Sequence, residues 1–543
     1  MTPDTPAPAP TDKRDAFARL VPFGRNGTLA IMLGGLALSF WLAGYFVIYY
    51  RNADMDFMIV YNALALNDGK TQAFFDHPSY FTILSVKWWF QVMHALGGMS
   101  AWKLSAIPSA FNLPAFEAAM TEAVRAGRVV AWLTATALVA IYAWLVRYAV
   151  RDWRVAMLAA FAFAFSGGVA VQLRILRSEM IAGSLFAFAL LVLIAASRYA
   201  TAWRPLLIGA AAALCVLGME NKIQIILLIA ALPALILPFG SAATASHAFW
   251  KHPSQAWIAV AVAGIAAMLA LRAAVPLIFV ALDPAVTSAA SLRPLIGGTF
   301  GLYQIALLGW IGLAMIAYAL IWRVNATETM AAMFAVIAGA SVALLALYLQ
   351  YDPGNVAAVI NPIEKMMNFA DADPHSDTAS KLLQNLGVLF GYFTHLLARY
   401  SFVLFTSPRP TVFLIWFIVP GIFFAIYKRE YQTALQATLL MAVAAGIDTL
   451  GVQRGLKPEY YIFTDPLIIL AGALLLDRLE DLRWSRWTYP IGAVLIVAHI
   501  GISQAEAIKH VFKRSGPEYI CEWNQVYQPE LPMPWCDLPP KKP

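Results

Sequence analysis

Charged side chains are scarce in this chain of 543 residues. Aspartate, glutamate, lysine and arginine make up 13% of it, whereas soluble domains carry about 25%. Hydrophobic residues account for 61%. This composition excludes a water-soluble globule, so the chain is expected to lie in a membrane.

The sequence also lacks the short motifs of many soluble enzymes. It contains no Walker loop, no zinc-type spacing of cysteine and histidine, and no glycine-rich dinucleotide fingerprint. The net charge is +7, but much of the positive charge lies in short loops, which is the ordinary signature of membrane topology. We therefore expect no nucleic acid among the partners.

Cysteine is rare as well, with three in the chain. Cys215 lies in an apolar run and is expected to be inert, whereas Cys521 and Cys536 lie in a polar C-terminal segment. A pair in that segment would suit an oxidising compartment. We predict a disulfide between Cys521 and Cys536.

Long apolar runs are what the sequence has in abundance. A helix needs about 20 apolar residues to cross about 30 Å of hydrocarbon, and in lipid its backbone amides must bond within the segment. The runs predict an all-α, polytopic integral membrane protein with about thirteen transmembrane helices and amphipathic helices in its external loops. The predicted spans are 28–50, 129–148, 155–173, 180–197, 205–219, 223–239, 257–281, 298–321, 330–349, 410–427, 432–451, 461–477 and 487–505.

The first residues set the predicted orientation. Residues 1–27 are rich in proline and alanine and carry several basic residues, so they read as a disordered cytoplasmic tail. A cleaved signal peptide is the weaker interpretation, because the apolar run 28–50 is long enough to span the membrane. An odd number of spans then places the C-terminus outside, where a disulfide persists.

Two long half-polar stretches interrupt the apolar runs. Within a transmembrane domain of residues 28–505, we predict external loops at 51–128 and 350–409, followed by a periplasmic tail at 506–543. The apolar part of the second loop, 385–406, is expected to be interfacial or re-entrant. The predicted location is a bacterial inner membrane, with a cytoplasmic N-terminus and an active site that faces the periplasm.

An acidic pair follows the first predicted span directly. Asp54 and Asp56 lie in the run Arg51–Asp56, at the hydrocarbon edge, where a carboxylate costs desolvation energy unless it is paired, hydrated or bound to a metal. A carboxylate held there can act as a general base on an acceptor hydroxyl or amine. The structural alternative is a solvated pair that ends the helix.

Two further polar groups lie between apolar runs. Arg177 and Glu179 precede the fourth span, where Glu179 is favoured by the helix N-terminus. Glu220 and Lys222 lie between the fifth and sixth spans, and Lys222 would meet a lipid-linked phosphate as a point charge. The structural alternative for Arg177 and Glu179 is a helix cap, and that for Glu220 and Lys222 is a tight polar turn.

The loop before the twelfth span is unusually basic for an external loop. Arg454 and Lys457 oppose the cytoplasmic bias of basic residues, which favours a role with a ligand. Tyr460 and Tyr461 follow in the same loop.

The order of these motifs along the chain resembles that of the C-type (GT-C) membrane glycosyltransferases, such as the aminoarabinose and protein O-mannosyl transferases. The shared layout is an acidic motif after the first span, a long first external loop, an Arg/Glu loop before span four, a lone lysine after span five and a late Arg…Tyr-Tyr loop. It covers most of residues 28–480, although only short motifs match in letters.

The resemblance implies an activity and roles for particular residues. Such enzymes move a sugar from a polyprenyl-phosphate-linked donor to a lipid, glycan or protein acceptor at the external membrane face. Asp54 matches the aspartate that acts as base, and Asp56 falls near the second acidic position; the spelling Asp-Met-Asp departs from the adjacent Asp-Glu of several relatives. Lys222 and Arg454 would contact the donor phosphate, with Glu179 in support.

The resemblance also bears on cofactors and partners. No soluble cofactor is required, because the lipid phosphate is already the leaving group. Some relatives use a divalent metal and others do not, so a Mg²⁺ or Mn²⁺ ion at Asp54 and Asp56 stays open. The alternative function is a transporter or flippase for a lipid-linked saccharide; a polymerase of lipid-linked glycans and a non-catalytic scaffold rank lower.

Overall fold

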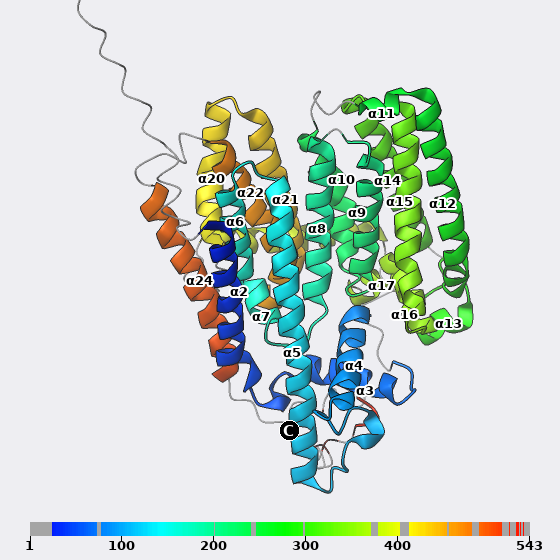
Figure 1. The fold of residues 1–543 in the computed structure, drawn as a ribbon, viewed down its shortest axis with the longest axis vertical. Coiled ribbons are helices and arrows are strands. Elements are labelled where there is room, and N and C mark those ends of the chain that lie inside the picture. Colours follow the sequence, from blue (N-terminus) through cyan, green and yellow to red (C-terminus); the bar gives the residue numbers. More distant parts are fainter. Residues whose placement is uncertain are drawn as a thin grey trace, which may run out of the picture.

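The computed structural model describes residues 24–72, 78–199, 201–240, 246–296, 299–370, 378–401, 412–452, 456–479, 488–512, 521, 528–531, 533 and 536. Helices and the turns between them make up these residues, and no strand occurs among them. The helices form an elongated bundle with a smaller helical subdomain at one end (Figure 1).

Seven of the described helices are long and apolar enough to cross a membrane, and five further apolar helices are shorter. The long ones are α2 (Gly24–Phe40), α5 (Leu113–Leu145), α8 (Glu179–Arg198), α12 (Pro253–Val280), α14 (Thr299–Ile321), α15 (Ala326–Leu344) and α21 (Tyr431–Val452). The shorter apolar segments are α6 (Trp153–Ala164), α9 (Arg204–Met219), Ile225–Phe239 beginning with α10 (Ile225–Ile236), Leu414–Tyr427 in α20 (Val412–Tyr427) and Val494–Ala505 in α24 (Thr488–Phe512). The prediction of an all-helical membrane protein is confirmed at this level.

The number of crossings stays a prediction. A helix occupies each of the thirteen predicted intervals, but several are short. The interval 155–173 is divided into α6 and α7 (Gly167–Gln172), with Ser166 capping α7. α22 (Asp465–Arg478) has 14 residues, which extend about 21 Å at 1.5 Å per residue, less than the hydrocarbon thickness.

Helices run through parts of both predicted external loops. α5 begins at Leu113 and runs unbroken for 33 residues, so the end of the predicted first loop is continuous with a membrane helix (Figure 1). The apolar part of the second predicted loop lies largely in α18 (Thr378–Ser401), which packs against α21. Residues 402–406 lie outside the described residues.

The subdomain at one end has its own core. α3 (Met58–Asn67), α4 (Tyr80–Ala95) and the first part of α5 bury Phe57, Met58, Val86 and Phe90 together. We call this end of the bundle the α4 end, and the opposite end, where α11 (Ala248–Lys251) lies, the α11 end (Figure 1).

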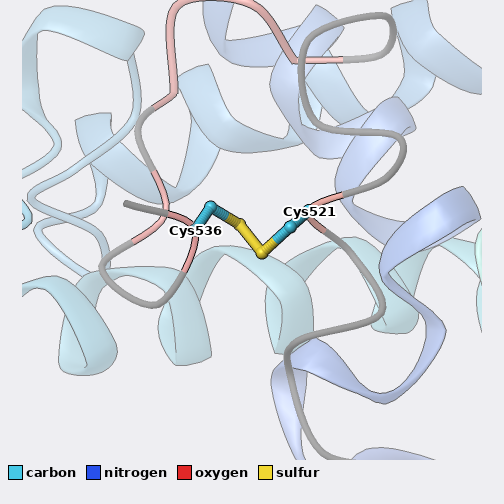
Figure 2. Close-up of a disulfide and its surroundings, with 2 residues drawn as sticks. All are labelled: Cys521 and Cys536. Atoms are coloured by element: carbon cyan, nitrogen blue, oxygen red, sulfur yellow. A yellow bond between two sulfur atoms is a disulfide. The ribbon is translucent and has the colours of Figure 1, made fainter. Parts of the chain in front are cut away.

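The C-terminal segment packs on this subdomain. Leu531 and Met533 are buried in its core, and Glu530 forms an ion pair with Lys70, just after α3. Cys521 and Cys536 form a disulfide, with their Cα atoms 5.1 Å apart (Figure 2). The segment thus belongs to the α4 end of the molecule.

A short helix, η9 (Pro458–Phe463), packs against α7 and α8. The contact is made at two glycines, one in each helix. A Cβ atom at Gly168 of α7 would lie 2.5 Å from the backbone nitrogen of Ile462, and one at Gly183 of α8 would lie 2.9 Å from the Ile462 oxygen. Side chains at these positions would push η9 away, so the two glycines permit η9 to lie against α7 and α8.

Gly168→Ala is therefore expected to destabilise the protein. The added methyl group overlaps backbone, which cannot move like a flexible side chain, and overpacking of this kind costs about 1–3 kcal/mol. Gly446→Ala in α21 is the matched control, because nothing lies within 4 Å of its Cβ position. Thermal unfolding in detergent should show a lower midpoint for Gly168→Ala alone; equal midpoints would contradict the close packing of η9.

Candidate functional site

Four charged side chains and one tyrosine from three separate parts of the chain meet at the α4 end of the bundle. They are Arg177, Glu179, Lys222, Glu459 and Tyr460, and we call them the charge cluster. Two positive and two negative groups balance in formal charge. Such a balance is what burial requires, because an unpaired charge inside a protein is strongly destabilising.

Glu179 is the centre of the charge cluster. It is the first residue of α8 and is fully buried. Its Oε1 lies 2.8 Å from Nζ of Lys222 and 3.2 Å from Nη2 of Arg177, whose Nε donates to Oε2 at 3.2 Å. The helix N-terminus also favours a carboxylate at this position. One carboxylate therefore fixes two cations.

η9 closes the cluster from the other side. Nη1 of Arg177 lies 3.7 Å from the carboxylate of Glu459, and the ring of Tyr460 lies under Arg177 and Lys222, at 5.9 and 6.0 Å from its centroid. The side-chain amide of Gln172 donates to the Glu459 carbonyl at 3.0 Å. The side chain of Glu459 is 16% exposed, more than the other charged members, so the cluster opens toward η9.

Burial and charge act in opposite directions on Arg177. Burial alone would lower the pKa of its guanidinium, but the carboxylates of Glu179 and Glu459 outweigh that effect and raise the pKa above its usual range. Arg177 is thus positively charged at any physiological pH.

Lys222 is positioned by a turn that caps α4. The carbonyl oxygens of Glu220 and Asn221 accept hydrogen bonds from the backbone nitrogens of Tyr80 and Ser79, at 3.2 and 3.1 Å. The Asn221 side chain accepts another from the nitrogen of Phe81. These bonds satisfy N–H groups that the first turn of a helix leaves without partners. The turn that carries Lys222 is therefore held to the α4 subdomain.

The acidic motif after the first helix is tied to the same place. Asp56 is fully buried. Its Oδ2 lies 2.8 Å from Nη2 and 2.9 Å from Nε of Arg128, and its Oδ1 accepts from the backbone nitrogen of Leu176 at 2.8 Å. Leu176 immediately precedes Arg177 of the charge cluster. Asp56 thus anchors the turn η3 (Ala53–Phe57) beside the cluster.

Other predicted site residues lie nearby without joining the cluster. The backbone of Asp54 lies in η3, two residues before Asp56, while its side chain and the whole of Arg454 are outside what the structure describes. Lys457 precedes η9 and its side chain is exposed, whereas Tyr461 is buried within η9.

The predicted Mg²⁺ or Mn²⁺ site at Asp54 and Asp56 has one described ligand. Both oxygens of Asp56 are occupied by Arg128 and by the Leu176 nitrogen. Among the described residues no group of three or more potential metal ligands is found. A metal ion at this place would therefore depend on Asp54.

Glu220 differs from the other acids at this end. Its side chain is fully buried, and neither carboxylate oxygen has a hydrogen-bond partner among the described residues. Burial raises the pKa of Glu220 well above its usual range. The group therefore resists ionisation in the folded protein and is suited to carry a proton.

Two residues of this site have no place in the sequence prediction. Glu459 lies in the loop that carries Arg454 and Lys457, whose basic character alone does not indicate a role for an acid. Arg128 pairs with Asp56 across 72 residues. The sequence signal that could have identified Arg128 is its place next to a long apolar run, because charges in membrane helices are rare and usually paired.

A large apolar cavity reaches the end of the bundle at which the charge cluster lies. It has a volume of about 610 Å³ and lies among α9, α10, α14 and α15. At the α4 end its lining includes Met219 and Ile360, and Met219 directly precedes the turn that carries Lys222. From there it extends toward the α11 end, where Arg204 and Trp322 line it.

Comparisons of the chain with protein-family models, curated proteins and solved structures find no match. The chemistry of the charge cluster therefore rests on its own geometry: two fixed cations, a buried protonatable carboxyl close in sequence to one of them, and an apolar cavity whose lining reaches Met219, just before the turn of Lys222.

Glu220→Gln is expected to stabilise the protein increasingly as pH rises. The folded pKa of Glu220 is raised above the unfolded value of about 4.3, so its contribution to stability is full below pH 4 and is lost as pH rises toward the folded pKa. The loss is at most about 1.4 kcal/mol per pH unit.

Thermal unfolding between pH 5 and pH 8 checks this. The midpoint of Glu220→Gln should exceed that of the wild type by a margin that grows with pH, whereas Glu430→Gln, at an exposed position, should show none. A pH-independent margin would contradict the buried, unpaired state of Glu220.

Proposed function

We propose that this protein is a membrane glycosyltransferase that moves a sugar from a polyprenyl-phosphate-linked donor to a lipid or glycan acceptor at the periplasmic face of a bacterial inner membrane. The observation that carries the proposal is the convergence of Arg177, Glu179 and Lys222 at the end of the bundle that a large apolar cavity reaches at Met219. A ligand that suits both parts has an anionic head and a long apolar chain.

The phosphate of the donor would be bound by cations of the charge cluster. Arginine matches phosphate oxygens with its planar fork and lysine meets them as a point charge. Glu179 holds both side chains in place before the ligand arrives, which lowers the reorganisation that transfer requires. Lys457 and Arg454, on the approach to η9, would add positive charge.

The apolar chain of the donor would lie in the cavity. Its lining is almost entirely apolar, as expected of a site for hydrocarbon. Because Met219 of the lining is followed directly by the turn of Glu220 and Lys222, a chain that enters the cavity brings its head to the charge cluster.

Transfer then needs a base for the acceptor. The bond between the anomeric carbon and the phosphate oxygen breaks, and polyprenyl phosphate leaves with its negative charge stabilised by Lys222 and Arg177. The acceptor oxygen bonds to the anomeric carbon and gives its proton to Asp54. Asp56, which is paired with Arg128, would hold η3 in position.

A transporter or flippase for a lipid-linked saccharide is the second candidate function. The observation in its favour is that the cavity reaches from the α4 end to Arg204 at the α11 end. Proteoliposomes separate the two: movement of a labelled lipid-linked sugar without a new glycosidic bond would favour the transporter.

Lys222→Gln should lower the rate of sugar transfer by about 10²–10³-fold, as expected for loss of one charged group that stabilises a leaving oxyanion. The assay is transfer from a synthetic polyprenyl-phosphate sugar by purified protein in nanodiscs. Lys251→Gln, at the exposed end of α11, is the control and should retain wild-type activity. Wild-type activity in Lys222→Gln would exclude the charge cluster as the phosphate site.

Substitutions of the two aspartates should have different effects on transfer and on stability. Asp54→Asn should lose at least about 10²-fold in transfer while its unfolding temperature stays near that of the wild type, because only the base is removed. Asp56→Asn should instead lose stability, about 3–5 kcal/mol, because it leaves Arg128 buried without its partner. A folded, fully active Asp54→Asn variant would remove Asp54 from the mechanism.

A further inference from the structure

A second buried ion pair lies at the α11 end of the cavity. Arg204 begins α9 and Glu328 lies in the first turn of α15, and both residues are almost fully buried, at 2% and 1% exposure. Nη1 of Arg204 lies 3.3 Å from Oε1 of Glu328. The pair links the two helices where they enter the bundle.

This pair is incompletely satisfied, unlike the charge cluster. None of the three guanidinium nitrogens of Arg204 makes a well-formed hydrogen bond to a described residue. The Ser246 oxygen accepts a hydrogen bond from the nitrogen of Asn325, and its single O–H lies within reach of Glu328, where it can satisfy at most one of the two carboxylate oxygens. An arginine has five N–H donors, and burying them without partners is costly.

The pair faces the cavity. Arg204 and Glu328 are part of its lining, and the indole nitrogen of Trp322, which also lines it, is buried without a partner among the described residues. Beyond these groups the lining is almost wholly apolar. A ligand that satisfies this end must carry polar groups on its head and an apolar chain behind it.

We propose that the α11 end of the cavity binds a phospholipid with a phosphoethanolamine headgroup. The phosphate would accept hydrogen bonds from Arg204, the primary ammonium would donate to Glu328, and one acyl chain would extend into the cavity. A purely anionic headgroup would pair with Arg204 but would be repelled by Glu328. A purely cationic headgroup would pair with Glu328 but would be repelled by Arg204. A zwitterion with N–H donors matches both charges at once.

This site is separate from the proposed transfer reaction. It lies at the end of the cavity opposite Lys222, although the two ligands would place their chains in the same apolar space. The binding of phospholipid is therefore measured without any transfer assay, and a failure of one proposal leaves the other open.

Lipid retention tests the proposal. The full chain is reconstituted in nanodiscs of equimolar phosphatidylethanolamine and phosphatidylglycerol, extracted into detergent and examined by native mass spectrometry. The wild type should retain phosphatidylethanolamine about tenfold over phosphatidylglycerol, the ratio expected from one hydrogen bond between charged groups. Arg204→Gln should lose retention of both lipids, and Glu328→Gln should lose the preference alone. Equal retention of the two lipids by the wild type, or unchanged retention by Arg204→Gln, would overturn the proposal.

Two more variants keep the test decisive if Arg204→Gln does not fold. Ala212→Phe fills the cavity without touching the ion pair and should abolish retention; retention at the wild-type level would overturn the proposal. Glu430→Gln, at an exposed position, should retain phosphatidylethanolamine like the wild type, and a loss there would contradict the assignment of the headgroup to Arg204.

Discussion

The arrangement of the α4 end depends on Glu179, a single buried carboxylate that holds two cations. Its two oxygens meet Arg177 and Lys222 at 2.8–3.2 Å. Neither cation could be buried alone at an acceptable cost, and neither is near the other in sequence. The carboxylate therefore fixes the loop before α8 and the turn after α9 relative to each other, and η9 packs onto the resulting platform through Glu459 and Tyr460.

This platform explains why several separate segments are rigidly held at one end of a mostly apolar bundle. Asp56 connects η3 to Leu176, beside the platform, and Asn221 connects the Lys222 turn to α4. Glycines at 168 and 183 let η9 approach. Together these contacts place an acidic motif, two cations and a protonatable carboxyl at the end of the bundle that the apolar cavity reaches at Met219. Preorganisation of this kind is what stabilisation of a departing phosphate needs.

The sequence was a good guide to the helices and a partial guide to the site. Apolar runs near 20 residues leave the backbone no alternative to helix in lipid, so the positions of the helices followed from composition. The short spans could not be distinguished from full crossings, because the apolar run 155–173 does not reveal the break at Ser166, which caps α7. The sequence singles out Arg177, Glu179 and Lys222 as polar groups at helix ends, and the structure brings them together. Their pairing, the role of Arg128 and the burial of the Glu220 carboxyl depend on contacts across many residues, which no local pattern encodes.

The most direct measurement is a cryo-electron microscopy map of the protein in nanodiscs with added polyprenyl phosphate. The account predicts phosphate density within about 4 Å of Nζ of Lys222, the distance of an ion pair, with the chain running into the cavity from Met219. Phosphate density at Arg204, or at any place away from Lys222 and Arg177, would contradict it.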